Sequence, residues 1–283
     1  MRVLVTGAAG MVGRAVVAHC LASGDEVGAY DRASLDIADP AAVRSVFERE
    51  RPHAVINCAA WTDVDGCEAD PARALSVNAE GPANLAAAAR GVGAGLVTIS
   101  TDYVFDGTKD GFYTQRDYPA PESVYGAAKL EGERRAQSAC ARTVVVRTGW
   151  IFGAGGRNFL SRVVELSERG QRLKVISDAW GTPTSAADLA RRLRELAELD
   201  LPGVYHVVNA GGGASYEEFA RAALAAAGLG GESLEVVTTA SLARKAPRPR
   251  NCRLRCLLSE AVGLEPLPDW RLALKEFVRN SGQ

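Results

Sequence analysis

The sequence predicts an α/β protein with a doubly wound parallel β-sheet and a smaller lobe in the second half of the chain. Three observations predict this fold. Short apolar segments alternate with helical segments of ten or more residues, closely spaced glycines follow the first apolar segment, and the alternation loosens after Gly149. Strands that alternate with helices form βαβ units, in which helices cover both faces of a parallel sheet.

Five β-branched segments in the first half are expected to form the central strands. Val3–Thr6 and Thr143–Arg147 are apolar at consecutive positions, as strands buried on both faces should be. The expected strands are Val3–Thr6, Glu26–Tyr30, Ala54–Asn57, Leu96–Ser100 and Thr143–Arg147. The helices expected between them are Met11–Ala22, Pro40–Arg51, Pro71–Arg90 and Ser123–Cys140. Two of these helices open with a proline, which suits the first turn because its missing N–H is not needed there.

The second half has a looser pattern and no linker rich in Ser, Gly or Pro. Helices are expected at 159–169, 186–199, 216–227 and 270–278, and strands at 173–176, 204–208 and 234–238. The arginine- and proline-rich segment 244–255 is expected to be an ordered loop. We therefore expect a domain over residues 1–150 and a smaller lobe over 151–283 that is interleaved with it and not independent.

Composition argues against several classes of protein. A net charge of −1 and a pI near 6.4 give no electrostatic reason to expect binding to nucleic acid or to a membrane. The first apolar run ends at Gly7, too early for a secretory signal, and no apolar stretch reaches bilayer-spanning length. The six cysteines are scattered without zinc-ligand spacing, so no metal site is predicted. We expect a cytoplasmic protein with reduced thiols.

A glycine motif connects the first strand to the first helix. Its residues are Gly7-Ala8-Ala9-Gly10-Met11-Val12-Gly13, which follow the spacing G-x-x-G-x-x-G. Such glycines allow a tight turn and a close approach of the backbone to a pyrophosphate, and the helix N-terminus supplies N–H donors. The motif predicts that this segment, including Met11 and Val12, binds a dinucleotide.

Polar residues after the second strand are candidates for the adenosine end of that cofactor. Asp31 can accept hydrogen bonds from the ribose, which favours NAD, whereas Arg32 can pair with a 2′-phosphate, which favours NADP. Asp36, followed by Ile37, is a further candidate near the adenine. We expect NADPH, with NADH as an alternative.

A tyrosine and a lysine in one helical segment are the candidate catalytic pair. Tyr125 and Lys129 are four residues apart and so lie on one helix face. Hydride addition to a ketone creates an alkoxide that needs a proton, and a nearby ammonium lowers the pKa of a phenol from its usual value near ~10. Lys129 can also hold the ribose of the nicotinamide. Thr101, at the end of the fourth strand, can polarise the carbonyl.

These motifs occur in the order found in extended short-chain dehydrogenases/reductases. The chain resembles, more narrowly, the dTDP-4-dehydrorhamnose reductase family. The resemblance covers nearly the whole chain and rests on residues 57–65 (NCAAWTDVD), 100–107 (STDYVFDG), 125–133 (YGAAKLEGE), 147–150 (RTGW) and 248–251 (RPRN). It implies a Rossmann-like fold and NAD(P)H-dependent reduction of the C4 keto group of a dTDP-linked 4-keto-6-deoxysugar, such as dTDP-4-dehydro-L-rhamnose.

The resemblance also implies roles for particular residues. Tyr125 would donate the proton, and Thr101 would contact the carbonyl. Lys129 would lower the pKa of Tyr125 and anchor the ribose. Ala59 and Ala60 would lie along the cofactor, with Asn78 supporting the adjacent sheet edge. The residues implied near the sugar nucleotide are Thr62, Val64, Thr101, Asp102, Trp150 and Arg248.

Three positions depart from the family pattern. Gln115 stands where glutamate is usual, Arg255 where aspartate is usual, and Gly149 where serine or alanine is common. The last of these could alter the sugar pocket. A magnesium requirement is attributed to some members, but no distinctive acidic cluster supports one here. The oligomeric state is left open, with a homodimer as one alternative.

Two other functions share much of this pattern. Epimerases and dehydratases of the extended class keep the glycine motif, the tyrosine and the lysine, but a dehydratase typically has an acidic pair beside the threonine. Here Asp102 is followed by Tyr103. A regulatory subunit of methionine adenosyltransferase also resembles the family, and Trp150 favours the reductase because a flat aromatic side chain suits a sugar or base face.

Overall fold

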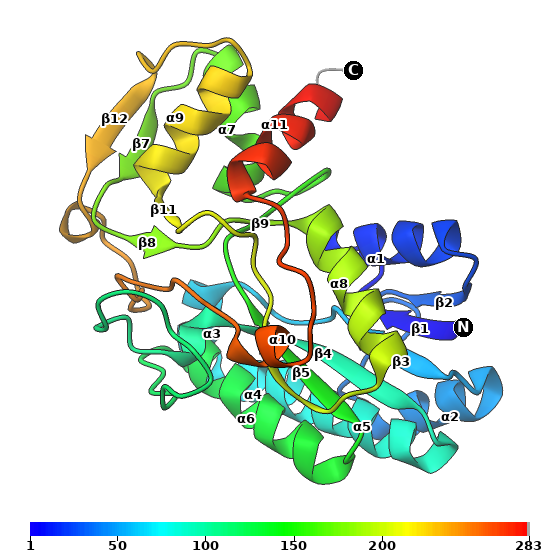
Figure 1. Cartoon of the computed structure of the whole chain (residues 1–283). Helices are drawn as coiled ribbons and strands as arrows, with labels where there is room; N and C mark the ends of the chain where they lie inside the picture. The colour runs from blue at the N-terminus through cyan, green and yellow to red at the C-terminus, as the bar shows by residue number, and fades with distance from the viewer. Residues whose placement is uncertain (282–283) are drawn as a thin grey trace.

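The computed structural model describes residues 1–281, and a six-stranded parallel sheet forms its centre (Figure 1). The strand order is β10-β5-β4-β3-β1-β2. These strands are β1 (Arg2–Thr6), β2 (Glu26–Tyr30), β3 (Ala54–Asn57), β4 (Gly95–Thr101), β5 (Thr143–Thr148) and β10 (Gly203–His206). The predicted doubly wound parallel sheet is therefore confirmed, and its carboxyl edge carries the ends of β1, β3, β4 and β5.

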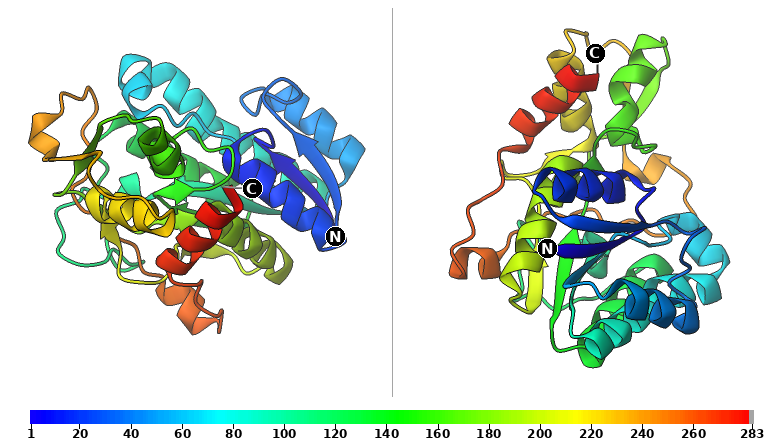
Figure 2. Two further views of the ribbon diagram at one scale, coloured as in Figure 1. Left: turned by 90° about the horizontal axis from the view of Figure 1, so that it is seen from above. Right: turned by 90° about the vertical axis from the view of Figure 1, so that its right-hand side faces the viewer.

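Helices cover both faces of this sheet (Figures 1 and 2). On one face α1 packs along α8, and on the other α5 packs between α2 and α6. The helices are α1 (Met11–Ala22), α2 (Pro40–Glu50), α5 (Gly81–Val92), α6 (Val124–Ala139) and α8 (Ala186–Leu199). Since α8 and β10 come from the second half of the chain, the sheet is completed by residues beyond position 151.

Side chains that alternate along the strands fill the hydrophobic cores on both faces of the sheet. Val3 and Val5 of β1 are buried in the cluster beneath α1 and α8, whereas Leu4 is buried in the cluster beneath α2 and α5. Because successive side chains of a strand point to opposite faces, one apolar strand contributes to two cores.

The helix expected at Pro71–Arg90 is interrupted, and this prediction is wrong. The chain forms α4 (Pro71–Leu75), a π-helical turn η1 (Ser76–Glu80) and then α5. Pro82, near the start of α5, has no N–H for the preceding turn, which disfavours one continuous α-helix. A short helix α3 (Val64–Ala69) also precedes α4, and Asp63 caps it by accepting a hydrogen bond from the Gly66 N–H.

A smaller lobe lies beside the carboxyl edge of the sheet, at the top of Figure 1. Its core joins Phe152, Phe219 and Trp270, which are fully buried. The helices are α7 (Phe159–Glu168), α9 (Tyr216–Ala226) and α11 (Trp270–Ser281), with α10 (Leu257–Ala261) lower in the molecule. The short strands are β6 (Ile151–Phe152), β7 (Leu173–Ile176), β8 (Trp180–Gly181), β9 (Thr184–Ser185), β11 (Ala214–Ser215) and β12 (Leu234–Val237).

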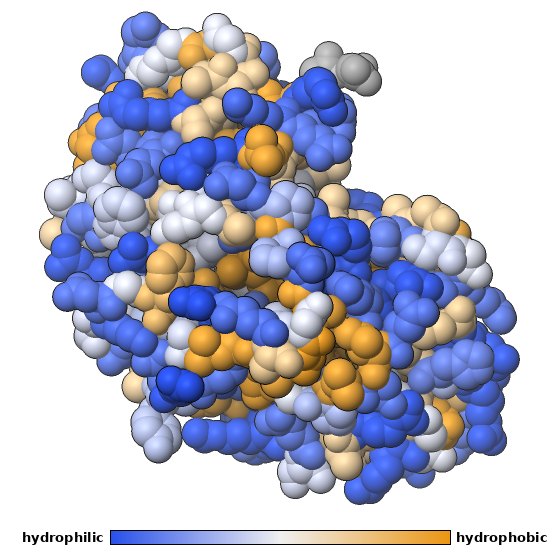
Figure 3. Space-filling model, in the orientation of Figure 1, coloured by the Kyte–Doolittle hydropathy of each residue, from blue (hydrophilic) through white to orange (hydrophobic). Residues whose placement is uncertain are grey.

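The arginine-rich segment 244–255 is an ordered loop, as expected. Asn251 forms an isolated bridge to Trp180 of the smaller lobe, and Leu254 forms one to Tyr113, so segment 244–255 connects this lobe to the loop between β4 and α6. Hydrophobic side chains gather on the face around α10 (Figure 3). Within residues 1–281, no helix combines the length and the apolar character that crossing a membrane requires.

Candidate active site

The glycine motif forms the predicted turn between β1 and α1. Gly7 has a positive φ of 67°, and a Cβ there would lie 2.6 Å from the backbone nitrogen of Ala59. A Cβ on Gly13 would overlap the carbonyl oxygen of Gly7. Gly10 is the N-cap residue of α1 and, lacking a side chain, makes no capping hydrogen bond. The turn thus requires glycine at positions 7 and 13, and no side chain caps the first N–H groups of α1. This arrangement makes the turn a suitable cradle for a pyrophosphate.

A cavity of about 260 Å³ adjoins this turn and has the lining expected for an adenosine site. Predicted residues in its lining are Gly7, Gly10, Asp31, Arg32, Asp36, Ile37, Ala59 and Ala60. Sequence reasoning missed Trp61 and Arg73 here; the Arg73 guanidinium lies 4.2 Å from the centre of the Trp61 ring. A second arginine therefore stands in the same cavity as Arg32.

The carboxyl groups of this cavity shape local turns. One oxygen of Asp31 accepts hydrogen bonds from the N–H groups of Ala33 and Ser34 and from the Ser34 hydroxyl. These bonds, with Ser34 first, lower the pKa of Asp31. Asp36 accepts from the Ala38 N–H in the same way, whereas Arg32 is exposed.

Two buried asparagines fix the loop after β3, which passes between this cavity and the next. The Asn57 side chain joins three strand ends: it accepts from the Thr6 hydroxyl at 2.7 Å and donates to the Thr98 hydroxyl at 3.0 Å. Asn78, on η1, makes two 2.9 Å hydrogen bonds with the backbone of Trp61. The π-helical turn thus carries the side chain that holds Ala59–Trp61 in position.

A second cavity of about 500 Å³ lies between the carboxyl edge of the sheet and the smaller lobe. That volume is in the usual range for a small-molecule site. It brings together residues from strand ends, α1, α6 and the lobe that the sequence predicted separately. The predicted residues in its lining are Gly10, Met11, Val12, Gly13, Ala59, Ala60, Thr62, Val64, Thr101, Asp102, Tyr125, Lys129 and Trp150.

Tyr125 stands in the first turn of α6, where the local sequence fixes it. The Ser123 side chain caps the helix by accepting from the Gly126 N–H at 3.1 Å, and a Cβ on Gly126 would overlap the carbonyl oxygen of Tyr103. Burial raises the pKa of Tyr125, and an interaction with the Thr101 hydroxyl acts in the opposite direction. The expected lowering of this pKa by Lys129 does not appear, because burial is the dominant effect.

Lys129 lies one turn further along α6 and is 4% exposed. Its Nζ donates to the carbonyl oxygen of Ile99 at 2.5 Å. Burial lowers the pKa of Lys129 to about 8, while the negative charge of Glu133 opposes the shift. At neutral pH the ammonium form therefore predominates.

Glu133 continues the same helix face and anchors α6 to the sheet. It pairs through both oxygens with Arg147 of β5, at 2.9 and 2.6 Å, and accepts from the Ser100 hydroxyl of β4. All three side chains are buried. A buried ion pair is stable only when additional hydrogen bonds such as this one satisfy its charged groups. The pair between Glu133 and Arg147 therefore fixes α6, which carries Tyr125 and Lys129, against the sheet next to Thr101.

Two residues in the lining of this cavity carry a buried oxygen that makes no hydrogen bond among residues 1–281: Asp102 through Oδ2 and Thr148 through Oγ1. The other oxygen of Asp102 accepts from the Thr101 hydroxyl at 2.9 Å. Buried polar groups without partners are costly, so they mark a place where a polar ligand can contribute the missing bonds.

Trp150 closes the cavity from the side of the smaller lobe. Its backbone is left-handed, with a φ of 51°, and its ring stacks on Tyr216 with centroids 3.9 Å apart. A Cβ on Gly181 would overlap the Trp150 ring. Sequence reasoning missed Tyr216 and Gly181, since 66 residues separate Tyr216 from Trp150 and no local pattern connects them.

Of the six residues predicted near the sugar nucleotide, Arg248 is the one that the structure does not bring into the lining of this cavity. Its Nη2 lies 3.0 Å from Oδ2 of Asp65, and its Nη1 donates to the carbonyl oxygen of Ala246. The backbone N–H of Ala246 and then Arg248 lower the pKa of Asp65. Arg248 is thus engaged with the carboxylate of Asp65, the residue after Val64.

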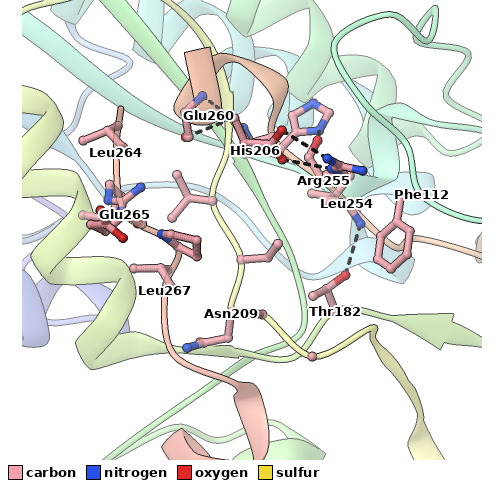
Figure 4. A pocket seen from close by; sticks show the side chains of 18 of the residues that line it. Phe112, Thr182, His206, Asn209, Leu254, Arg255, Glu260, Leu264, Glu265 and Leu267 are labelled. Carbon is pink, nitrogen blue, oxygen red and sulfur yellow. Dashed lines mark hydrogen bonds and ion pairs between the residues drawn. The ribbon is translucent and has the colours of Figure 1, made fainter. Parts of the chain in front are cut away.

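A separate cavity of about 220 Å³ lies between the end of β10 and α10 (Figure 4). His206 is buried there and its Nδ1 lies near the carbonyl oxygens of Tyr113 and Arg255, while Arg255 pairs with Glu260. It contains none of the predicted site residues. Among the described residues, no group of three His, Cys, Asp or Glu side chains is arranged to hold a metal ion.

A phenol and an ammonium one helical turn apart, across from a strand-end threonine and next to a glycine turn, are typical of extended short-chain dehydrogenases/reductases. The fold and the site define the protein as one of this class. More narrowly, the chain belongs to the family described as RmlD substrate binding domain, whose family model matches residues 1–282.

Known relatives agree with this membership. The chain is 43% identical to dTDP-4-dehydrorhamnose reductase of Streptomyces griseus, over 97% of this chain and 92% of the relative. It is 37% identical to dTDP-4-keto-6-deoxy-D-glucose reductase of Streptomyces niveus, over 97% and 96%. A solved dTDP-4-dehydrorhamnose reductase of Bacillus anthracis, in complex with NADP, superposes with a TM-score of 0.95 at 34% identity, covering 99% of both chains.

Proposed function

We propose that this protein is an NADPH-dependent reductase of the C4 keto group of a dTDP-linked 4-keto-6-deoxysugar. The main candidate reaction converts dTDP-4-dehydro-L-rhamnose to dTDP-L-rhamnose. The observation that carries the proposal is that Thr101, Tyr125 and Lys129 line one cavity that opens onto the glycine turn. Near-full-length identity to reductases of dTDP-4-ketosugars supports the substrate class.

The roles of the three residues follow from their chemistry. A bound nicotinamide would supply the hydride. Tyr125 remains a neutral phenol at pH 7, since burial raises its pKa, and so carries the proton that the developing alkoxide requires. Thr101 offers a hydroxyl to the same oxygen and favours carbonyl polarisation. Lys129 brings a buried positive charge and N–H donors to the ribose hydroxyls.

The remaining predicted residues surround the sugar nucleotide in this proposal. Thr62 lies on the loop after β3, Val64 begins α3, and Trp150 offers an aromatic face from the smaller lobe. Asp102 adds a polar group to the lining. An aromatic face and a few placed polar groups suit a deoxysugar, which has both apolar and hydroxylated sides.

The preference for NADPH rests on the adenosine cavity. Arg32 and Arg73 both line it, whereas the Asp31 carboxylate is already engaged by its own turn. Charge-assisted contact with a 2′-phosphate contributes roughly 1.5–3 kcal/mol, or about ten- to a hundredfold in affinity. We expect Arg32→Ala to lose most of the preference for NADPH over NADH. Equal use of both cofactors by the wild type, unchanged in Arg32→Ala, would show that Arg32 does not bind the 2′-phosphate.

A direct assay tests the function. Purified protein is incubated with dTDP-4-keto-6-deoxyhexoses and NADPH or NADH, and cofactor oxidation is followed beside product formation. A reductase consumes one cofactor per product, whereas an epimerase or dehydratase consumes none. A methionine adenosyltransferase subunit would show no turnover and would co-purify with that enzyme. A cytoplasmic location stays a prediction from the sequence, which leaves a magnesium requirement and the oligomeric state open, with a homodimer as one alternative.

A further inference from the structure

Asp102 is a buried carboxyl group in the lining of the candidate active site. It is 3% exposed and follows β4 directly after Thr101. Its Oδ1 accepts from the Thr101 hydroxyl at 2.9 Å, its Oδ2 is buried next to Gly149, and the Cys252 thiol interacts with the carboxyl group. Thr101 in turn interacts with the Tyr125 phenol. The three side chains therefore form a continuous series of groups that can donate and accept a proton.

Gly149 provides the space in which this carboxyl group sits. A Cβ at position 149 would overlap all three atoms of the Asp102 carboxyl group, namely Cγ, Oδ1 and Oδ2. A side chain at position 149 would therefore require the Asp102 carboxyl group to shift. The arrangement of Asp102 thus depends on the absence of a side chain on the neighbouring strand end.

The surroundings of Asp102 favour a neutral carboxylic acid. No lysine or arginine forms an ion pair with it within the described part of the chain. The groups that face it are uncharged: the Cys252 thiol and the phenols of Tyr103, Tyr125 and Tyr216.

The cations nearest to these groups are engaged or distant. Arg248 pairs with Asp65, and Lys129 donates a hydrogen bond to the Ile99 carbonyl oxygen. Arg244 acts on Tyr216 through its charge, without a hydrogen bond, and lowers the pKa of the phenol. Burial accordingly raises the pKa of Asp102 to about 7, with the Thr101 hydroxyl and the Cys252 thiol opposing the shift.

We propose that Asp102 is the proton reservoir of this site and that Gly149 is the residue that seats it. After Tyr125 has given its proton to the sugar alkoxide, the O–H bond of Asp102 breaks and its proton passes to Oγ1 of Thr101. The proton of that hydroxyl passes to the Tyr125 phenolate, so the phenol is restored and Asp102 is left as a carboxylate. Asp102 regains a proton from water when product leaves.

The proposal rests on the proposed function, and its test separates the first turnover from later ones. Asp102→Asn retains size and a hydrogen-bonding group but carries no exchangeable acid proton. Because Tyr125 begins with its own proton, the later turnovers of Asp102→Asn should be about tenfold or more slower than the first turnover of the same variant at saturating substrate. The loss of rate that the wild type shows above about pH 7 should be absent from the variant.

Gly149→Ala supplies an independent variant. The new methyl group displaces the Asp102 carboxyl without removing it, so the steady-state defect and the altered pH profile should recur. Gly91→Ala is the matched control, because a Cβ at that α5 position meets nothing within 4 Å. A pH-dependent carboxylic-acid C=O band in infrared difference spectra, present in wild type and absent in Asp102→Asn, would report the proton independently of activity.

The outcomes are distinct. If wild-type protein reduces no dTDP-ketosugar, the proposed function fails. If wild type is active but Asp102→Asn changes only KM, or slows the first and later turnovers equally, the reservoir role is wrong and Asp102 only positions substrate. An infrared band that is absent from wild type at pH 6 would likewise overturn the proposal.

Discussion

The ring of Trp150 stacks on the ring of Tyr216 with their centroids 3.9 Å apart and their planes inclined by 30°. The two residues come from the end of the central sheet and from the first turn of α9. Their contact joins the smaller lobe to the catalytic edge. It also orients the indole toward the cavity that contains Thr101, Tyr125 and Lys129.

Trp150→Ala should lower kcat/KM for the nucleotide sugar by about tenfold, since a lost aromatic contact of ~1.4 kcal/mol corresponds to that factor. Gly181→Ala should cause a smaller loss in the same direction, because the new Cβ pushes against the retained indole. Steady-state kinetics on folded protein checks both. Losses of thermal stability with unchanged kinetics would mean that Trp150 only packs the lobe.

Tyr125→Phe should abolish most turnover while cofactor binding stays nearly intact. The phenol acts only when the alkoxide develops, and positioned proton donation contributes ~10²–10⁴-fold to rate. NADPH titration by fluorescence is the matched control for an intact site. Retention of more than about half of wild-type activity, a far smaller loss than proton donation accounts for, would exclude Tyr125 as the acid.

Arg248→Ala should raise KM for the nucleotide sugar by about tenfold with little change in kcat. We expect Arg248 to exchange Asp65 for the substrate diphosphate, with which a guanidinium can form two parallel hydrogen bonds. Asp65→Asn is the informative partner variant, because freeing Arg248 should lower KM. An unchanged KM in both variants would leave Arg248 with a structural ion pair alone.

His206 should make the protein lose stability in mild acid. Burial, with Arg147 nearby, lowers the pKa of His206 from 6.5 to about 4, so below pH 6.5 the unfolded chain binds this proton first. The free energy of unfolding should therefore fall as pH decreases, by about 2 kcal/mol at pH 5 from this group alone. Denaturant unfolding at pH 7 and pH 5 should show a smaller difference in His206→Gln than in wild type.

Parallel behaviour of wild type and His206→Gln would mean that His206 is protonated equally in the folded and unfolded states.

Local sequence patterns were sufficient to predict the central sheet and the helix that carries Tyr125 and Lys129. Val3, Leu4 and Val5 are apolar at consecutive positions because both faces of β1 are buried. Ser123 marks the start of α6, because its side chain caps the helix. The interruption of the helix after Leu75 was not predictable from periodicity. It serves a tertiary contact, in which Asn78 holds the backbone of Trp61.

Contacts between distant segments account for the other differences. The stacking of Tyr216 on Trp150 and the pairing of Arg248 with Asp65 depend on how the smaller lobe docks, which no window of sequence encodes. The sequence showed that Gly149 departs from the family pattern. Only the structure relates that glycine to the carboxyl group of Asp102.

The most direct test of the proposed function is the transfer of label from deuterated cofactor to product. Purified protein is supplied with a dTDP-4-keto-6-deoxyhexose and NADPH that carries deuterium at the transferred position. We expect one deuterium at C4 of the product sugar, with one cofactor oxidised for each product molecule formed. Product that lacks deuterium, or that accumulates without net oxidation of NADPH, would contradict the assignment as a reductase.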